Sequence, residues 1–164
     1  VSKKNEGLSK TLNYGIQIAR HGYIARMDCD DISTLDRLKI QIDFMEKNPK
    51  IVLIGGSAVE INEEGTYVCD RIAEVNEDKI REKLPFTSVI HPTVMFRRDV
   101  AKQTNGYPEE INKGEDAVFF FSMYQKGRVI NLPNILLKYR VSRFSLSPRD
   151  KKSQKRFRKK KKFF

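Results

Sequence analysis

The stretch Tyr23-Ile24-Ala25-Arg26-Met27-Asp28-Cys29-Asp30-Asp31 joins a mostly apolar run to three carboxylates within four positions. The apolar run suits a buried strand, and ligands of open α/β sheets bind beyond the ends of such strands. Because side chains alternate along an extended chain, Asp28 and Asp30 are expected on one side and Asp31 on the other. Two carboxylates on one side suit a hard divalent cation such as Mg²⁺ or Mn²⁺. The alternative is that Asp30, Asp31 and Ser33 form a turn and cap the next helix.

The length of 164 residues fits one domain with a real hydrophobic core. Its formal net charge of +11 is concentrated at one end, because residues 149–162 carry ten basic residues and one acidic residue. We therefore predict a nearly neutral domain over residues 1–147 and a basic, disordered tail over residues 148–164. Cys29 and Cys69 lack the spacing of metal ligands or of a disulfide framework, which favours a reducing compartment.

Hydrophobic spacing divides the rest of the chain into alternating helices and strands. Residues 8–19 and 35–45 carry apolar side chains at helical spacing, and Ser33 with Asp36 resembles a capping box for the second helix. The apolar, β-branched run 51–61 predicts a strand in which a Gly-Gly pair lets another segment approach closely. Further strands are predicted over 23–27, 66–72, 93–97, 129–132 and 136–140, and further helices over 77–84, 98–103 and 117–125. This alternation indicates an α/β fold with a mostly parallel sheet flanked by helices and a small antiparallel addition.

Short motifs follow one another along the chain, and an isolated Asp-x-Asp motif would carry little weight without their order. They are Asn5-x-Gly7-Leu8, Leu12-Asn13-x-Gly15, residues 23–31, Arg37-Leu38, His91-Pro92-Thr93, Gly106-Tyr107, Glu115-Asp116 and Tyr139-Arg140. The ordered series resembles the family-2 glycosyltransferases with a GT-A fold, especially bacterial enzymes that build capsular and other surface polysaccharides. The resemblance covers about residues 1–147 and implies a GT-A-like sheet.

The resemblance also implies roles for the acidic stretch. Asp28 and Asp30 match the family's Asp-x-Asp motif, which holds Mn²⁺ or Mg²⁺ and, through the metal, the diphosphate of a nucleotide sugar. Asp31 matches a further acid of this subgroup, either as a ligand or as a support for the ligands. Arg26 is expected to face the phosphates or the carboxylates, because a guanidinium fork suits both, whereas Arg37 is assigned to a structural partnership.

On the acceptor side, Asp116 of the Glu115-Asp116 pair matches the family's catalytic base. It would deprotonate an acceptor hydroxyl for a direct displacement that inverts the sugar carbon. The alternative is that both acids are ordinary first-turn charges of a helix. Glu115, His91, Arg97 and Tyr107 are the candidates for substrate contact, and each has a structural alternative in an ion pair or in the core.

Three departures from the family pattern accompany the resemblance. The family opens with a strand, a helix and a second strand that bind the nucleotide base, so this chain is expected to be N-terminally truncated and to form the C-terminal two-thirds of the domain. Leu35 stands where the family commonly has Pro. Ala117-Val118-Phe119-Phe120 stands where the family has an aromatic, an acid, Leu and Trp, which removes an expected polar contact on the acceptor side.

The resemblance implies a nucleotide-sugar donor, a glycan or lipid-linked acceptor, and a cytoplasmic enzyme at the inner face of the cell membrane. The basic tail suits an anionic membrane surface; its interleaved Phe157 also suits nucleic acid, which the nearly neutral body makes the weaker interpretation. A solvated tail is the plainest interpretation. A nucleotidyltransferase would share the carboxylates but would need a Gly-rich phosphate loop, which this sequence lacks. A binding module acting through the tail and an inactive fragment remain as alternatives.

Overall fold

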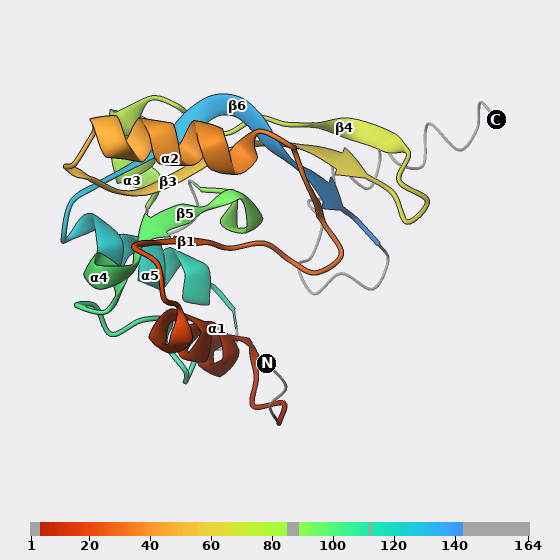
Figure 1. Ribbon diagram of the computed structural model, residues 1–164. Coiled ribbons are helices and arrows are strands. Elements are labelled where there is room, and N and C mark those ends of the chain that lie inside the picture. Colours follow the sequence, from red (N-terminus) through yellow and green to blue (C-terminus); the bar gives the residue numbers. More distant parts are fainter. Residues whose placement is uncertain (1–3, 85–88, 112, 143–164) are drawn as a thin grey trace.

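The computed structural model describes residues 4–84, 89–111 and 113–142. In these residues a six-stranded sheet has helices on both faces (Figure 1). The helices are α1 (Leu8–Ile18), α2 (Arg37–Lys47), α3 (Glu77–Lys83), α4 (Arg98–Ala101) and α5 (Glu115–Tyr124), with a 3₁₀ turn at His91–Thr93. The strands are β1 (Tyr23–Ala25), β2 (Ile32–Ser33), β3 (Ile51–Ile61), β4 (Tyr67–Arg71), β5 (Met95–Arg97) and β6 (Arg128–Arg140). The predicted α/β character of the chain is confirmed.

The strands lie in the order β1-β5-β3-β6-β2, and β4 pairs with β3 outside this path. The prediction of a mostly parallel sheet is wrong for this part of the chain, because β3 and β6 form the only parallel pair among the described strands. Residues 62–66 form a tight turn between β3 and β4, and such a turn can join only antiparallel strands. Parallel pairing needs a long crossover, which the chain supplies between β3 and β6.

Strand β6 is continuous where the sequence predicts two strands. Its pairing with β3 loses register after Leu132 and resumes at Ile135, so Pro133 and Asn134 form a bulge. Proline has no N–H to donate to a neighbouring strand, and it interrupts the strand pattern in the sequence for the same reason. The bulge therefore lets one long strand continue across the two residues that interrupt the strand pattern in the sequence.

The start of α2 also differs from its prediction. Ser33 lies in β2 opposite Leu137 of β6, and its Oγ donates a hydrogen bond to Thr34 O at 3.0 Å. The helix begins at Arg37, and the side chain of Asp36 makes no capping hydrogen bond. The predicted capping box is therefore wrong, because pairing with β6 holds Ser33 in the sheet and away from the helix.

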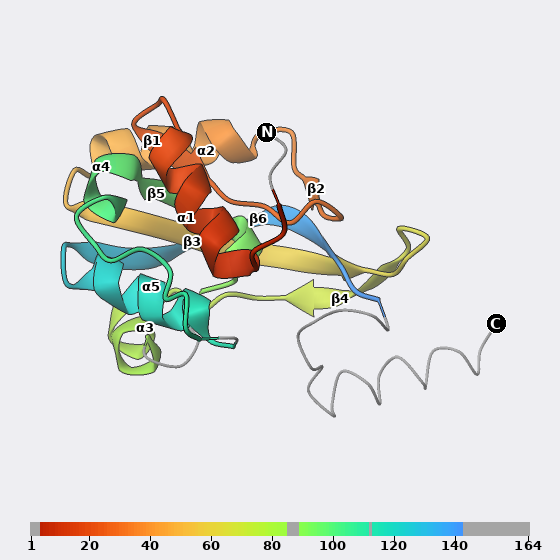
Figure 2. The same ribbon diagram turned by 90° about the horizontal axis from the view of Figure 1, so that it is seen from below.

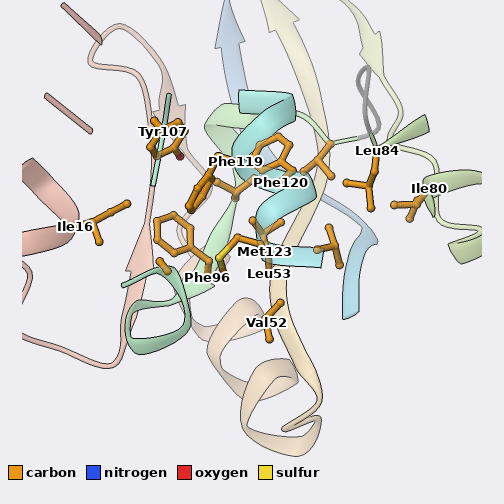
Figure 3. Packing of buried hydrophobic residues seen from close by; sticks show 14 residues of the cluster. Ile16, Val52, Leu53, Ile80, Leu84, Phe96, Tyr107, Phe119, Phe120 and Met123 are labelled. Carbon is orange, nitrogen blue, oxygen red and sulfur yellow. The ribbon is translucent and has the colours of Figure 1, made fainter. Parts of the chain in front are cut away.

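Alternating side chains of β3 and β5 build a hydrophobic core on each face of the sheet. Leu53 and Phe96 belong to the core beneath α1 and α5, whereas Ile54 and Met95 belong to the core beneath α2. Figure 3 shows the first of these cores, in which Phe96 meets Phe119 of α5 edge to face with ring centroids 5.2 Å apart. This core fixes α5 against the sheet and so sets where the N-terminus of α5 lies.

The Gly-Gly pair of β3 allows the close approach that the sequence predicts. A Cβ at Gly55 would lie 2.5 Å from both Asn131 Oδ1 and Val89 Cγ1. We expect Gly55→Ala to lower the free energy of unfolding by about 2 kcal/mol, because two packed neighbours must move. Gly15→Ala is the control, since a Cβ there meets no atom within 4 Å and should stabilise α1 by about 0.5–1 kcal/mol. Urea denaturation of both variants tests the expectation, and equal effects would contradict it.

No helix in the described part of the chain is long and apolar enough to cross a membrane. The predicted basic tail over residues 148–164 lies outside the described residues, as do its expected contacts with a membrane or with nucleic acid. The division of the chain at residue 147 stays a prediction.

Candidate active site

The acidic stretch forms a turn after β1 and does not continue the strand. β1 ends at Ala25, and a hydrogen bond from Asp31 N to Asp28 O at 3.3 Å closes the turn. Asp30 is exposed and Asp28 half-buried, whereas Asp31 is only 7% exposed. The strand predicted over residues 23–27 is therefore two residues too long, and alternation along an extended chain does not decide where the carboxylates point. The turn considered as the alternative does form, but it caps no helix.

Arg26 is a buried cation bound to the first carboxylate of this turn. Its Nη1 donates to Asp28 Oδ2 at 2.9 Å, and its Nη2 lies 2.5 Å from Asp28 Oδ1. The pair is a two-pronged guanidinium–carboxylate contact, which is among the stronger charge-assisted hydrogen bonds in proteins. The backbone N–H of Arg26 donates to Val94 O at 3.0 Å, which holds the start of the turn against the segment before β5. Arg26 therefore has the place beside the carboxylates that the sequence predicts.

Asp31 carries a buried negative charge that the described residues compensate only in part. Its Oδ1 accepts a hydrogen bond from Arg140 N at 2.8 Å, while its Oδ2 has no hydrogen-bond partner among the described residues. Burial, assisted by the charges of Asp28 and Asp30, raises the pKa of Asp31 to about 6. A cation near this turn would relieve the cost of burying that charge.

We call residues 28–31, with their three carboxylates, the carboxylate turn. Its chemistry fits a divalent cation, because it offers hard oxygen ligands and a buried carboxylate oxygen with no hydrogen-bond partner among the described residues. The described residues contain no group of three His, Cys, Asp or Glu side chains that could hold a metal on their own. Any metal here would therefore take further ligands from its substrate or from water, as Mg²⁺ commonly does at phosphate sites.

The raised pKa of Asp31 predicts a pH-dependent gain from its removal. A carboxyl whose folded-state pKa lies above its ordinary value weakens the fold as pH rises from about 4 to 6, and the full cost persists above pH 6. We expect Asp31→Asn to raise the free energy of unfolding by about 1–2 kcal/mol at pH 7.5 without metal, and by little at pH 4.5. Urea denaturation at both pH values measures this, with exposed Asp30→Asn as the control. An equal effect of Asp31→Asn at both pH values would contradict the assignment.

Arg37 makes the structural contacts predicted for it. Its buried guanidinium donates to Arg26 O at 2.8 Å, to Val94 O at 3.3 Å and to Gln41 Oε1 at 3.0 Å. Gln41 in turn donates to Thr93 O at 2.9 Å. Burial lowers the pKa of Arg37 to about 10, so it remains a cation at neutral pH. Through Arg37, α2 thus holds the backbone of Arg26 at the start of the carboxylate turn.

Arg97 lies away from the carboxylate turn, which corrects its prediction as a substrate contact. Its guanidinium donates to Ile51 O at 2.9 Å, Met45 O at 2.8 Å and Tyr23 Oη at 2.9 Å. Tyr23 is the first residue of β1, and the turn follows the last. Antiparallel pairing of β5 with β1 carries Arg97 to that opposite end, where it joins β5 to β3 and α2.

His91 and Tyr107 form a buried pair, with His91 Nε2 3.0 Å from Tyr107 Oη. Burial, and to a lesser extent the charge of Arg26, hold the pKa of His91 well below its ordinary value, so the imidazole is neutral. Burial likewise raises the pKa of Tyr107. Because Tyr107 is 1% exposed and His91 is 9% exposed, the prediction that both contact substrate is replaced by the structural alternative.

Glu115 and Asp116 begin α5, directly after Gly114. Both are partly exposed, and Asp116 Oδ1 accepts a hydrogen bond from Ala117 N at 2.8 Å. Their charges add to burial in raising the pKa of Tyr107. Arg26 acts on the same tyrosine in the opposite sense.

Hydrogen bonds from Arg26 N to Val94 O at 3.0 Å and from Val94 N to His91 O at 3.2 Å tie the carboxylate turn to His91. From α5, Phe119 stacks on Tyr107 and Phe120 meets His91 edge to face, so both elements are attached to the His91–Tyr107 pair.

Arg140 is a contributor to this site that the sequence analysis did not assign. Its backbone N–H binds Asp31, and its Nε donates to Asp30 O at 2.8 Å. Arg140 Nη1 also binds the carbonyls of Asn62 and Glu63, at 3.0 and 2.8 Å. It stands in the Tyr139-Arg140 motif, so its place in the ordered series was the available signal. The end of β6 therefore braces the carboxylate turn.

Comparison with known families identifies the class of the chain. Residues 1–104 match the family described as Glycosyl transferase family 2. The match covers more than half of the 164 residues, and the chain belongs to that family. The family predicted from the order of the motifs is confirmed.

Two curated relatives are named for polysaccharide synthesis. The chain is 34% identical over 142 residues to the amylovoran biosynthesis glycosyltransferase AmsE of Erwinia amylovora, covering 85% of this chain and 52% of the relative. It is 35% identical over 138 residues to the O-antigen biosynthesis glycosyltransferase WbnJ of Escherichia coli, covering 82% and 53%. The chain thus spans about half the length of these relatives.

Solved structures share the fold at low sequence identity. TarS of S. aureus in complex with UDP-GlcNAc matches with a TM-score of 0.64 and 16% identity, over 88% of this chain and 42% of that one. The mannosyltransferase PcManGT of Pyrobaculum calidifontis, in complex with GDP-Man and Mn²⁺, matches with a TM-score of 0.60 and 13% identity, over 86% and 38%. The predicted GT-A-like fold is confirmed by these neighbours.

Proposed function

We propose that this chain carries the metal-binding and acceptor-activating parts of an inverting glycosyltransferase that acts in surface-polysaccharide synthesis. One observation carries the proposal: a turn with three carboxylates is tied through Val94 to His91, and α5, which begins with two acids, packs its Phe120 on the same His91. One of the three carboxylates is buried, with an oxygen that has no hydrogen-bond partner among the described residues. Such an arrangement leaves uncompensated negative charge beside a possible proton acceptor. It is suited to a metal–diphosphate group on one side and a hydroxyl on the other.

In this proposal Asp28 and Asp30 hold Mn²⁺ or Mg²⁺, which neutralises charge on the leaving diphosphate. Asp31 supports the turn from its buried position, and Arg140 binds it there. Arg26 lies against Asp28 and offers its guanidinium fork to phosphate oxygens. The structural neighbours support a nucleotide-sugar donor, since TarS is in complex with UDP-GlcNAc and PcManGT with GDP-Man and Mn²⁺.

Asp116 acts as the base on the acceptor side. Its carboxylate accepts the proton of an acceptor hydroxyl while that oxygen forms a bond to the anomeric carbon and the bond to the diphosphate breaks. Attack from the face opposite the leaving group inverts the sugar carbon. The names of the relatives, which refer to amylovoran and O-antigen biosynthesis, support a surface glycan or its lipid-linked precursor as the acceptor. We place the enzyme in the cytoplasm at the inner membrane face, with the tail as its contact.

The products of the reaction test this proposal. The complete protein is incubated with Mn²⁺, a lipid-linked acceptor and each of several nucleotide sugars, and the products are identified by mass spectrometry and proton NMR. A glycosyltransferase releases a nucleoside diphosphate, and the new linkage should have the opposite anomeric configuration to the donor. Release of pyrophosphate would favour a nucleotidyltransferase, and a retained configuration would overturn the role of Asp116.

A further inference from the structure

Asn13 of α1 binds both backbone groups of one residue far away in the sequence. Its Oδ1 accepts a hydrogen bond from Tyr107 N at 2.8 Å, and its Nδ2 donates to Tyr107 O at 2.8 Å, across 94 positions. Nδ2 also lies 3.2 Å from Glu109 Oε1. One side-chain amide thus satisfies a complete peptide donor and acceptor, as a neighbouring strand would. We call this contact the Asn13 clamp.

The segment around Tyr107 is shaped to receive the Asn13 clamp. Gly106 has φ +68°, and a Cβ there would lie 2.4 Å from Asn13 Oδ1, so glycine is needed for both backbone and space. A pocket of about 360 Å³ is lined by residues of α1 and of the segment 101–109. Figure 2 shows α1 lying across this side of the molecule, with both α4 and α5 to its left in that view. The hydrogen bonds of Asn13 thus add to the burial of Tyr107 in holding this segment on α1.

The side chain of Tyr107 carries the contact onward to α5. Its ring stacks on Phe119 with centroids 4.2 Å apart, and its hydroxyl meets His91, which in turn meets Phe120 at 5.5 Å edge to face. Figure 3 shows Tyr107 directly beside Phe119. Phe119 and Phe120 lie one turn after the acids that begin the helix, on the same rigid element. The start of α5 is thus two contacts away from Asn13.

We infer that Asn13 is a positioning residue for Asp116, acting through the backbone and ring of Tyr107; this inference rests on the proposed function. Without the clamp, residues 105–109 lose their anchor on α1 and the stacked ring no longer fixes the first turn of α5. A carboxylate displaced by about 1 Å from its working position can cost about a hundredfold in rate. Among the described residues, the hydrogen bonds that leave residues 26–31 go to Val94, Arg37 and Arg140, and none reaches Asn13 or Tyr107, so donor binding is expected to be independent of the clamp.

Two substitutions at Asn13 separate positioning from folding. Asn13→Leu keeps the size of the side chain and removes both hydrogen bonds, whereas Asn13→Asp keeps the acceptor and loses the donor. On the complete protein we expect kcat to fall about 10- to 100-fold in Asn13→Leu, with the donor Kd changed less than about twofold. Asn13→Asp should lower kcat at least as far, because it sets a carboxylate oxygen against Tyr107 O and Glu109 Oε1. Gly106→Ala should reproduce the loss of kcat, because its added Cβ would collide with Asn13 Oδ1.

Gln17→Leu is the matched control, since Gln17 lies one turn further along α1 and lines the same pocket. It should leave kcat unchanged. Hydrogen exchange gives a second readout that needs no turnover: Asn13→Leu should speed exchange of amides 117–120 and leave residues 26–31 as they were. A lower Tm with unchanged kcat and unchanged exchange in α5 would overturn the inference, and so would a parallel loss of donor binding. If the wild type transfers no sugar, the proposed function fails, and the exchange experiment still decides whether the clamp controls α5.

Discussion

Replacing Asp116 with Asn is expected to lower kcat about a thousandfold while leaving donor affinity within about twofold. The amide cannot accept the proton of an acceptor hydroxyl, so the attacking oxygen must carry that proton into the transition state. An Asn side chain still offers an oxygen to Ala117 N, which Asp116 binds at 2.8 Å, so α5 should begin as before. Initial-rate kinetics with both substrates varied on the complete protein, together with calorimetric donor titration, measure the two quantities.

Asp99→Asn is the matched control for this prediction. Asp99 is also an acid in the first turn of a helix, α4, and its exposed side chain is paired with Arg98. If Asp116 merely balanced the helix dipole, the two substitutions would each cost a few tenths of a kcal/mol in stability, and both variants would keep the turnover of the wild type. A loss of turnover confined to Asp116→Asn is the expected result. Equal turnover of both variants would remove Asp116 from the chemistry.

Replacing Asp28 or Asp30 with Asn is expected to lower kcat/KM for the donor at least a hundredfold at low Mn²⁺. A neutral amide is a poorer ligand for a hard cation, and charge neutralisation at the leaving diphosphate is worth several kcal/mol. The two variants should differ in one respect, because Asp28→Asn also releases Arg26 from its carboxylate partner, whereas Asp30 is exposed. Excess Mn²⁺ should therefore rescue Asp30→Asn more fully than Asp28→Asn.

The metal dependence of the rate measures this second prediction. Titrating Mn²⁺ at fixed donor concentration should give a higher half-saturating concentration for both variants than for the wild type. Asp43→Asn is the control, since Asp43 lies on the exposed side of α2 in an ion pair with Lys39. A wild-type rate that survives complete removal of divalent cations would contradict the assignment of both carboxylates.

The sequence located the candidate site more accurately than it described the sheet. Strand β3 was predicted at its observed bounds, because its run of apolar β-branched residues is long and leaves little choice. The acids after β1 were also found, because carboxylates beside an apolar run have few structural uses. Which strands pair, and in which direction, depends on connections that hydrophobic spacing does not record. The tight turn at residues 62–66 makes β3 and β4 antiparallel, but the antiparallel direction of β1 and β5 depends on contacts far away in the sequence.

The roles of individual polar residues were harder to predict than their positions. Arg26 directly follows β1 and Arg97 is the last residue of β5, and the sequence does not reveal that antiparallel pairing of the two strands sends these arginines to opposite ends. For His91 and Tyr107 the sequence leaves both substrate contact and a place in the core open, and their mutual hydrogen bond lets both be buried. Asn13 had a place in the motif series without a role, since a contact spanning 94 positions leaves no local signal.

Calorimetric titration of the complete protein with UDP-, GDP- and dTDP-sugars, with Mn²⁺ and again in EDTA, tests the central claim most directly. The account predicts that one nucleotide sugar binds in the presence of Mn²⁺ and that EDTA abolishes the binding. It also predicts that Asp30→Asn loses the signal at the same Mn²⁺ concentration while remaining folded. Binding that is equally strong in EDTA would contradict a metal site at the carboxylate turn, and a folded protein that binds none of the donors would contradict the proposed function as a whole.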